Sequence, residues 1–443
     1  MKNTSSGLLC WFVLACLWMC PIAALAQQNP YGNALTNNYL SQTLGPTSPG
    51  SAQFGTPYLG TSALAHSSAG AAAYSPTGPP LAEWGPFGVY PHLLNLLTYG
   101  NGIQAQPGVN STTVINTVSP GVFLRMGSLW FLDYTPCLAF YSNPIFHDTL
   151  DQRVVLHGAT TNGNWMLSLS QNYVDTTQPV VETGTQFELQ AYATAMNAVW
   201  QMGGKSSLEL GLSQIFRISE GLNNMHEWST AEWYNYQFQP QFGAALGVTG
   251  GYDELSLGSD NPFEQALGRV NFQPGSKLTL TVMGGVEDRQ FVHPSGPSVL
   301  NPVFDASARY LLGTGTLLTV SGNRVVTPSL IANDLNVITT VNANVRQRII
   351  GRMFFEIEGG YAGTTYTSIV PGPLPKYYFG TAPHAALAVI RSDTRTYGKI
   401  SLSTVFGTRL TGSIFYMISD NASSQSNFRY SGNEVGLNLD YRY

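Results

Sequence analysis

Apolar and polar residues alternate strictly along the last stretch of the chain, residues 433–443. The odd positions are Val435, Leu437, Leu439, Tyr441 and Tyr443, and the even positions between them are Gly436, Asn438, Asp440 and Arg442. This alternation is the period of a β-strand with one apolar face and one wet face. A strand of a soluble sandwich shows the same period, so alternation alone does not distinguish a soluble sheet from a membrane-embedded one.

The same period recurs in segments spread along the chain. It is clearest in residues 128–141, 165–173, 207–218, 335–349 and 353–361. One face of each segment carries leucine, valine or aromatic residues, and the other face carries serine, asparagine or charged residues. The polar face of a soluble sheet is its outside, whereas in a membrane barrel it faces the lumen, the wet space that the barrel encloses.

Short and long connections take turns between these segments. Tight turns are indicated near Gly127, Gly163, Gly203, Pro240, Gly275, Gly313, Gly351 and Gly407. Longer polar links are indicated near residues 142–150, 175–183, 220–227, 253–260, 288–297 and 323–332. An up-and-down barrel has short turns at one end and longer loops at the other, whereas a Greek-key sandwich has no reason to separate link lengths in this way.

These patterns predict an all-β fold, a transmembrane up-and-down antiparallel β-barrel with short periplasmic turns and long outer loops. Counting hairpins predicts about 18 strands, with about 16 as the alternative. The stretch 365–396 is expected to be an oversized link that constricts the lumen if it folds inward, and two ordinary extra strands are the alternative. Trp130 and Phe140 share a face, and a strand tilted by about 40° separates them by roughly 25 Å, the height of an apolar membrane band.

The first residues have the form of a secretory signal peptide, expected at 1–26. Lys2 precedes an apolar stretch from Leu8 to Trp18, and 24–26 form a small-x-small cleavage site. A lipoprotein is an alternative, because residues 13–16 loosely resemble a lipidation box. No other stretch approaches the roughly 20 apolar residues of a spanning helix, so an exported chain of this kind is expected to enter a second membrane as a barrel.

Residues 27–85 have the composition of a linker. They are rich in glycine, serine, alanine, proline, asparagine and glutamine, and they show no periodicity. Such a segment is too poor in apolar residues to bury a core, which predicts a disordered periplasmic linker. The alternative is a segment that threads into the barrel and partly plugs it. The barrel is expected to occupy residues 86–443.

Composition agrees with a barrel in lipid. Charged residues make up only 10% of the chain and aromatic residues 12%, whereas charged residues usually make up about 25% of soluble domains. The outer wall of a membrane barrel must stay uncharged, so fewer charges suffice. A mean hydropathy of -0.01 argues against a multi-helix membrane protein. A net charge of -5 without a basic cluster argues against nucleic-acid binding.

Three short patterns carry a family resemblance. They are residues 89–93, which read Val-Tyr-Pro-His-Leu, residues 119–122, which read Ser-Pro-Gly-Val, and the final Asp-Tyr-Arg-Tyr. On these patterns, residues 87–443 resemble the outer-membrane β-barrel porins of Gram-negative bacteria, some of which are encoded near exopolysaccharide genes. An acidic pair and an asparagine often follow the first strand in that family, and here only Asn101 is kept. The resemblance implies a fold and a location in the outer membrane, and it leaves the solute open.

The terminal strand resembles the assembly signal of outer-membrane barrels, which ends in an aromatic residue. The residues that would carry this signal are Leu439, Tyr441 and Tyr443. The resemblance implies that the barrel-assembly machinery binds this strand, and that outer-membrane lipid and lipopolysaccharide surround the folded wall.

No catalytic, cofactor-binding or metal-binding residues are expected. Cys137 is the only cysteine outside the signal peptide, and no two histidine or cysteine residues stand at metal-ligand spacing. The pairs His226-Glu227 and His147-Asp148 are interpreted as solvated loop residues, with a catalytic base at a rim as the alternative. A further alternative is an oxygen-rich calcium loop, whose ligands would be Asp253, Glu254, Asp260 and Asn261.

Charged residues on the polar faces are the candidates for the lumen. They are Arg125, Asp133, Glu209, Arg217, Arg269, Asp305, Arg309, Arg346, Arg348, Glu356, Glu358, Asp440 and Arg442. Both signs occur, and Arg346 and Arg348 are expected to face Glu356 and Glu358 across the turn at Gly351. Such a ladder either braces the wall or orients solutes, and bracing is the preferred interpretation.

The sequence therefore predicts a passive pore for small hydrophilic solutes or saccharides, without turnover and without a cofactor. Barrels of about 16–18 strands leave an aqueous channel unless something fills them. One alternative is an outer-membrane component of exopolysaccharide secretion, whose partner is a polymer. Another is a structural or adhesive barrel with a closed lumen.

Overall fold

A computed structural model describes residues 78–443 except 107, 178, 181, 293–295, 297 and 372–384. The predicted signal peptide and most of the predicted linker lie outside the described residues. The described part is almost entirely β-structure, and its only helix is a short 3₁₀ turn, Ser426–Phe428. Among the described residues, no helix is both long and apolar enough to span a lipid bilayer.

The strands follow one another along the chain with few interruptions. Their bounds are β1 Ala82–Trp84, β2 Phe87–Gln106, β3 Val109–Met126, β4 Trp130–Tyr141, β5 Thr149–Asn162, β6 Trp165–Thr176, β7 Pro179–Val180, β8 Thr185–Gln186, β9 Leu189–Gln201, β10 Ser206–Ser219, β11 Met225–Gln239, β12 Phe242–Leu255, β13 Asn261–Phe272, β14 Leu278–Arg289, β15 Val299–Leu312, β16 Thr316–Pro328, β17 Asp334–Ile350, β18 Met353–Pro371, β19 Ala385–Phe406, β20 Leu410–Ser423 and β21 Tyr430–Arg442.

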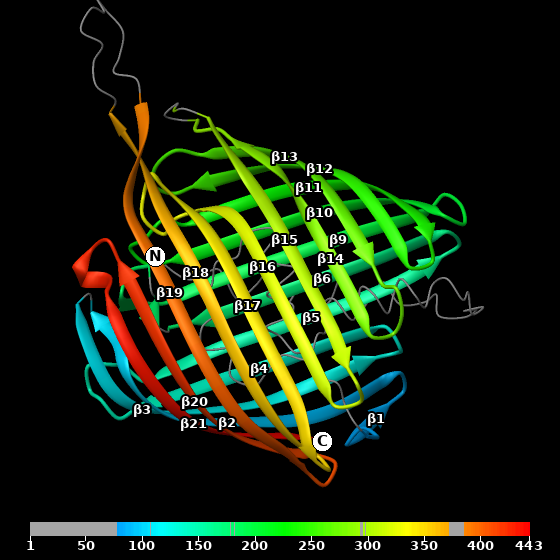
Figure 1. The fold of residues 1–443 in the computed structure, drawn as a ribbon, viewed down its shortest axis with the longest axis horizontal. Coiled ribbons are helices and arrows are strands. Elements are labelled where there is room, and N and C mark those ends of the chain that lie inside the picture. Colours follow the sequence, from blue (N-terminus) through cyan, green and yellow to red (C-terminus); the bar gives the residue numbers. More distant parts are fainter. Residues whose placement is uncertain are drawn as a thin grey trace, which may run out of the picture. The chain divides into compact units, whose positions relative to one another are not determined.

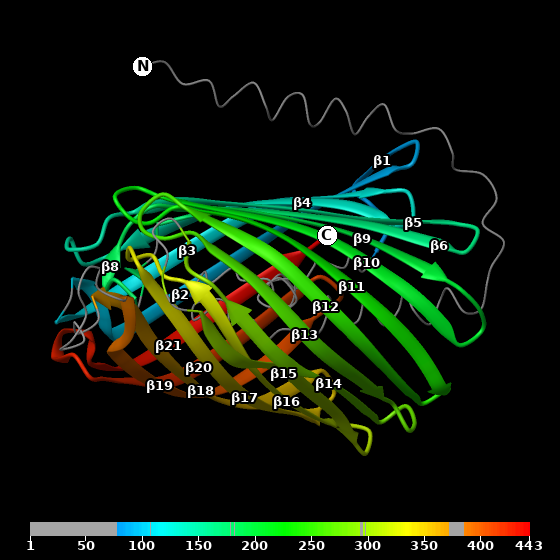
Figure 2. The same ribbon diagram turned by 90° about the horizontal axis from the view of Figure 1, so that it is seen from above.

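The sheet is closed. Each long strand pairs antiparallel with the next, β6 pairs with β9, and the last strand, β21, pairs with the first long strand, β2. The described residues thus form a closed barrel of 18 strands (Figures 1 and 2). The prediction of an up-and-down antiparallel barrel of about 18 strands is confirmed.

The alternation of short turns and long links is also confirmed. All eight predicted tight turns join consecutive strands at one end of the barrel, here called the turn end. Gly127, Gly163, Gly313, Gly351 and Gly407 adopt positive φ there, a conformation that costs glycine little. The opposite end, the loop end, carries the longer links, apart from the β2–β3 hairpin, where Gln106 pairs with Val109. One predicted link is placed wrongly, since β16 continues to Pro328 and its link to β17 comprises only 329–333.

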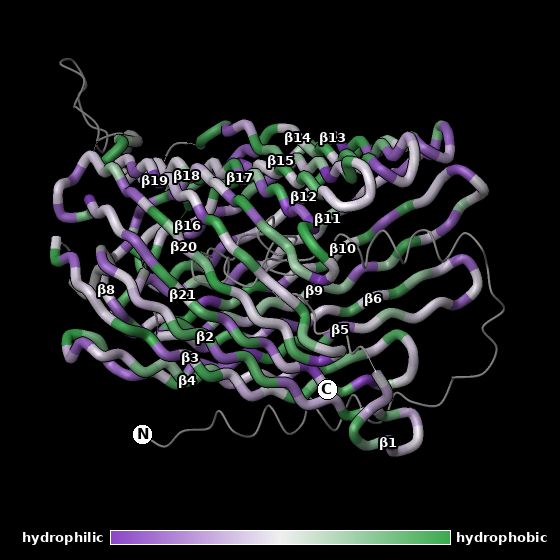
Figure 3. Tube along the Cα trace, turned by 60° about the horizontal axis from the view of Figure 1, so that its bottom comes forward, coloured by the Kyte–Doolittle hydropathy of each residue, from purple (hydrophilic) through white to green (hydrophobic). Residues whose placement is uncertain are grey.

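The strand that ends the chain shows the arrangement of the whole wall. Leu437 is 42% exposed and points outward, whereas the neighbouring Asn438 is 3% exposed and points inward. Figure 3 shows green and purple alternating along many strands in the same way. A wall that is apolar outside and polar inside is the reverse of a soluble protein, and such a surface is suited to lipid.

The stretch 365–396 lies mostly in the wall. Its described residues belong to β18 and β19, which pair with each other from Met353 and Thr404 to Pro371 and Ala385. The prediction that the whole stretch is a link is therefore wrong, and residues 372–384 lie outside the described residues. At the other end of the barrel, β1 lies within the predicted linker and pairs with the start of β2.

Candidate functional site

The polar face of the wall is its concave face. Arg269 on β13 donates a hydrogen bond of 2.8 Å to Glu209 on β10, although β11 and β12 lie between these strands. Side chains can bridge four strands only on the inside of a curved wall, because they diverge on the outside. Residues at the same alternating positions as Glu209 and Arg269 therefore face the lumen.

All thirteen charged candidates lie at these inward positions. Near the turn end, Arg125 lies 3.8 Å from Glu83, Asp133 lies 2.9 Å from the imidazole of His92, and Arg442 donates to Asp440 at 2.7 Å. Glu209 and Arg269 form the pair already described. The Arg442–Asp440 contact lies within β21, whereas the other three contacts each reach past at least one intervening strand, so these side chains brace the wall as well as line it.

The predicted ladder beside Gly351 forms only in part. Arg346 is the register partner of Glu356, but Glu358 is opposite Asn344, and Arg348 is opposite Phe354. The guanidinium of Arg346 also lies over the Phe354 ring, 4.2 Å from its centre. Arg348 and Arg309 are exposed at the turn end, and Asp305 is opposite Asn323 in mid-wall.

One row of lumen-facing residues was not predicted from the sequence. On β19 the inward positions are Arg391, Asp393, Arg395, Tyr397 and Lys399. The alternation was present, but the intervening positions carry serine, threonine and glycine, so the row lacked an apolar face. Tyr397 donates to Glu358 at 2.8 Å, which links this row to β18.

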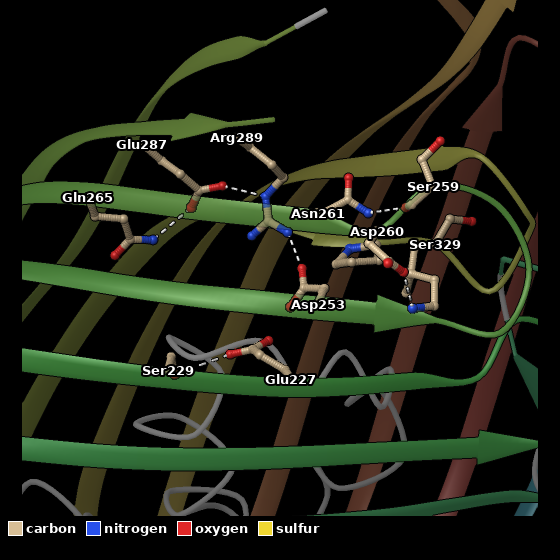
Figure 4. Close-up of polar contacts among 12 residues, drawn as sticks. Glu227, Ser229, Asp253, Ser259, Asp260, Asn261, Gln265, Glu287, Arg289 and Ser329 are labelled. Carbon is tan, nitrogen blue, oxygen red and sulfur yellow. Dashed lines mark hydrogen bonds and ion pairs between the residues drawn. The ribbon is translucent and has the colours of Figure 1, made fainter. Parts of the chain in front are cut away.

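A second inward cluster joins β11, β12 and β14 near the loop end (Figure 4). Arg289 forms ion pairs with Asp253 and with Glu287, the latter at 2.8 Å, and its guanidinium lies 4.4 Å from the centre of the Phe263 ring. Glu227 is buried and is the register partner of Asp253. The interpretation of Glu227 as a solvated loop residue is therefore wrong. At the loop end of the barrel the strands carry polar residues on both faces. The alternation of apolar and polar residues that predicts a strand is therefore absent from the sequence there.

The calcium-loop residues diverge. Asp253 points inward to Arg289, whereas Asp260 accepts hydrogen bonds from the Tyr252 hydroxyl at 2.8 Å and from the Leu255 amide at 3.0 Å. The described residues contain no group of three or more histidine, cysteine or acidic side chains that could hold a metal ion. His147 and Asp148 do lie in a link, where Asp148 accepts from the Tyr141 amide.

The link between β6 and β9, residues 177–188, crosses to the far wall. Its Glu182 accepts hydrogen bonds from Ser329, from the Leu330 amide and from Asn336, all of them at the β16–β17 connection or on β17. In one direction around the barrel, strands β10 to β16 separate β9 from β17. In the other direction, strands β18 to β21 and β2 to β5 separate β17 from β6. The link thus reaches nearly the opposite point of the barrel.

The link between β16 and β17, residues 329–333, folds in from that opposite wall. Arg217 on β10 donates to the carbonyls of Pro328 and Ser329, both at 3.1 Å. Leu330 packs on Leu189 and completes a small apolar cluster with Phe187 and Leu222. The two links therefore meet inside the loop end of the barrel, and together they are called the crossbar below.

No protein-family model matches the sequence, and a search of curated protein sequences finds no match. The fold is similar to several solved structures. One is the outer membrane protein opdK from Pseudomonas aeruginosa, with a TM-score of 0.40, 11% identity, and coverage of 83% of this chain and 100% of that chain. Another is P. aeruginosa OccK2 (OpdF) in complex with glucuronate, with a TM-score of 0.43, 12% identity, and coverage of 80% and 98%. A third is Acinetobacter baumannii OccAB4, with a TM-score of 0.42, 10% identity, and coverage of 83% and 100%.

Proposed function

We propose that this protein is an outer-membrane channel for the passive passage of small hydrophilic solutes. The observation that carries the proposal is the reversed wall, with exposed apolar residues outside and paired charges inside a closed barrel of 18 strands. A barrel of about this size encloses an aqueous space. Each of the 18 wall strands pairs with a neighbour on both sides, as a wall in lipid must.

The chemistry of the lumen supports solutes with little net charge. Cationic and anionic side chains are interspersed along the wall, as in the row Arg391, Asp393 and Arg395 and in the cluster around Arg289. Fields of opposite sign at close range cancel over the width of a channel, and salt screens what remains. We therefore expect weak ion selectivity and passage of neutral or zwitterionic solutes such as small saccharides.

The crossbar disfavours export of a polymer. A polysaccharide chain needs an unobstructed path, but residues 177–188 and 329–333 meet inside the loop end. Small solutes can pass beside such a constriction. The crossbar is therefore proposed as a constriction, and the constriction predicted for 365–396 stays a prediction, because residues 372–384 lie outside the described residues.

Location and partners follow from the same proposal. A signal peptide at 1–26 would export the chain, the barrel-assembly machinery would recognise the terminal strand, and lipopolysaccharide would contact the outer wall at the loop end. Residues 82–84 of the segment 27–85 form β1, and the rest of that segment is still proposed as a linker or partial plug.

Ion conductance in planar lipid bilayers tests the channel. The purified full chain is reconstituted beside a variant that lacks residues 27–77, which removes a plug if that segment forms one. Discrete conductance steps are expected from at least one of the two proteins. Folding is verified independently by heat-modifiable gel migration. A folded barrel that stays electrically silent in both forms would overturn the proposal.

A further inference from the structure

The carboxylate of Glu182 occupies a ready-made anion site. Its side chain is 0% exposed. One oxygen accepts from the Leu330 amide at 2.9 Å and from the Ser329 hydroxyl, and the other accepts from the Asn336 amide at 3.2 Å. Arg391 of β19 donates to the Glu182 carbonyl at 2.8 Å. Three donors converging on one carboxylate form charge-assisted hydrogen bonds, which are the strong kind.

The backbone that carries the three donors is held in place without Glu182. Asn336 lies in the regular ladder between β16 and β18. The backbone of 329–330 is fixed from β10 and its following link, because Arg217 donates to the Ser329 carbonyl and the Asn223 amide donates to the Leu330 carbonyl at 2.9 Å. A site that is preorganised by other contacts keeps its shape when its occupant leaves.

We propose that Glu182 is a carboxylate latch, a group of the chain's own that fills an anion site on the opposite wall and holds the crossbar closed. A free carboxylate that takes its place releases the β6–β9 link and widens the loop end of the lumen. This inference rests on the proposed channel, and it adds that the channel's opening depends on small carboxylates.

Competition with Glu182 sets the concentration of free carboxylate that is needed to open the latch. A group on a short link has an effective concentration in the millimolar range, so a free carboxylate competes when it is present at about 10–100 mM. A ligand shifts an equilibrium only through its different affinity for the two states. Here the anion site is accessible only when the latch is out, so carboxylate favours the open state.

Channel recordings on three proteins test the latch. Glu182→Gln removes the charge that the donors hold, and Glu188→Gln removes the same charge from an exposed residue of the same link. We expect Glu182→Gln to reduce the ratio of closed to open states by about tenfold, the effect of weakening one charge-assisted hydrogen bond. The Glu188→Gln control is expected to gate like the unmodified protein.

A change of anion supplies the second measurement. When sodium acetate replaces sodium chloride at about 100 mM, within the competing range, the open fraction of the unmodified protein should rise. Glu182→Gln, whose side-chain amide competes less well for the same three donors, should reach the same open fraction at a lower acetate concentration. A further variant, Asn336→Asp, places a second carboxylate against Glu182 and should open the channel in chloride. Heat-modifiable migration shows that each variant is folded.

The outcomes separate the two proposals. Equal gating of the unmodified protein and of Glu182→Gln, or an equal acetate requirement in the two proteins, overturns the latch while the channel stands. Silence of all folded variants overturns the channel.

Discussion

Glu209 on β10 and Arg269 on β13 form a 2.8 Å ion pair that spans the two intervening strands, β11 and β12. The Arg269 guanidinium also lies over the face of the Trp233 ring, 4.5 Å from its centre, and donates to the Asn235 side chain at 2.8 Å. The Arg269 side chain thus contacts three residues on two other strands: Glu209 on β10, and Trp233 and Asn235 on β11. The pair is mostly shielded from water, and its partners are all on the concave side of the wall.

The Glu209–Arg269 pair should contribute measurably to stability. Glu209→Gln leaves the Arg269 charge without its anionic partner, which we expect to lower the free energy of unfolding by about 1–3 kcal/mol. Denaturant unfolding of the purified barrel in lipid vesicles measures it. Arg348→Gln at the exposed turn end is the control and should change stability little. If the two variants unfold alike, the pair lines the lumen without bracing it.

A charge on the outer wall should prevent stable insertion. Ile400 is 47% exposed on β19, and its register partners on the same face are Ile357 and Tyr416. Ile400→Arg is expected to cost about 2–4 kcal/mol, as cations do near the bilayer midplane. The folded fraction after refolding into lipid vesicles measures the cost.

The matched control for that substitution is Ile145→Arg. Ile145 is 48% exposed, but it lies in the β4–β5 link outside the strands. The same change there should be nearly neutral. An arginine at Ile400 that is tolerated as well as one at Ile145 would contradict a lipid-facing wall.

Removing one lumen cation should change ion selectivity. Lys399 is buried on β19, directly opposite Glu358, and its ammonium lies 4.8 Å from the centre of the Phe415 ring. Lys399→Gln leaves an excess of negative charge at that level of the lumen, so permeation should shift toward cations. The reversal potential across a salt gradient shows the sign. Lys277→Gln, in the exposed turn before β14, should leave the reversal potential unchanged.

Substitution of Tyr443 should affect assembly in cells more than stability in vitro. The Tyr443 ring lies under the Arg409 guanidinium at 3.9 Å, a contact worth about 0.5–1 kcal/mol at an exposed site. Tyr443→Ala should therefore refold nearly as well as the unmodified protein in vitro. In cells we expect a several-fold loss of folded barrel from the outer membrane, while Tyr443→Phe retains it. Equal losses in vitro and in cells would show that Tyr443 acts through packing alone.

Local sequence patterns were sufficient to predict most strands of the wall and which of their faces is polar. The alternation in 433–443 and the turn at Gly351 each depend on neighbours in sequence, because side-chain direction in a strand has a period of two. The same rule placed Asp133, Glu209 and Asp440 on one face. It failed where polar residues occupy both faces, as around Glu227, and where the outer face is made of small residues, as along β19.

The sequence by itself determined that the chain forms a barrel with short turns at one end, because strand period, turn residues and link lengths are all local properties. Only the tertiary structure decided what the lumen contains. Glu182 and Asn336 meet from nearly opposite points of the wall, and Glu209 meets Arg269 across two strands. Such contacts depend on the closure and curvature of the whole sheet, and curvature leaves no periodic signal in the order of residues.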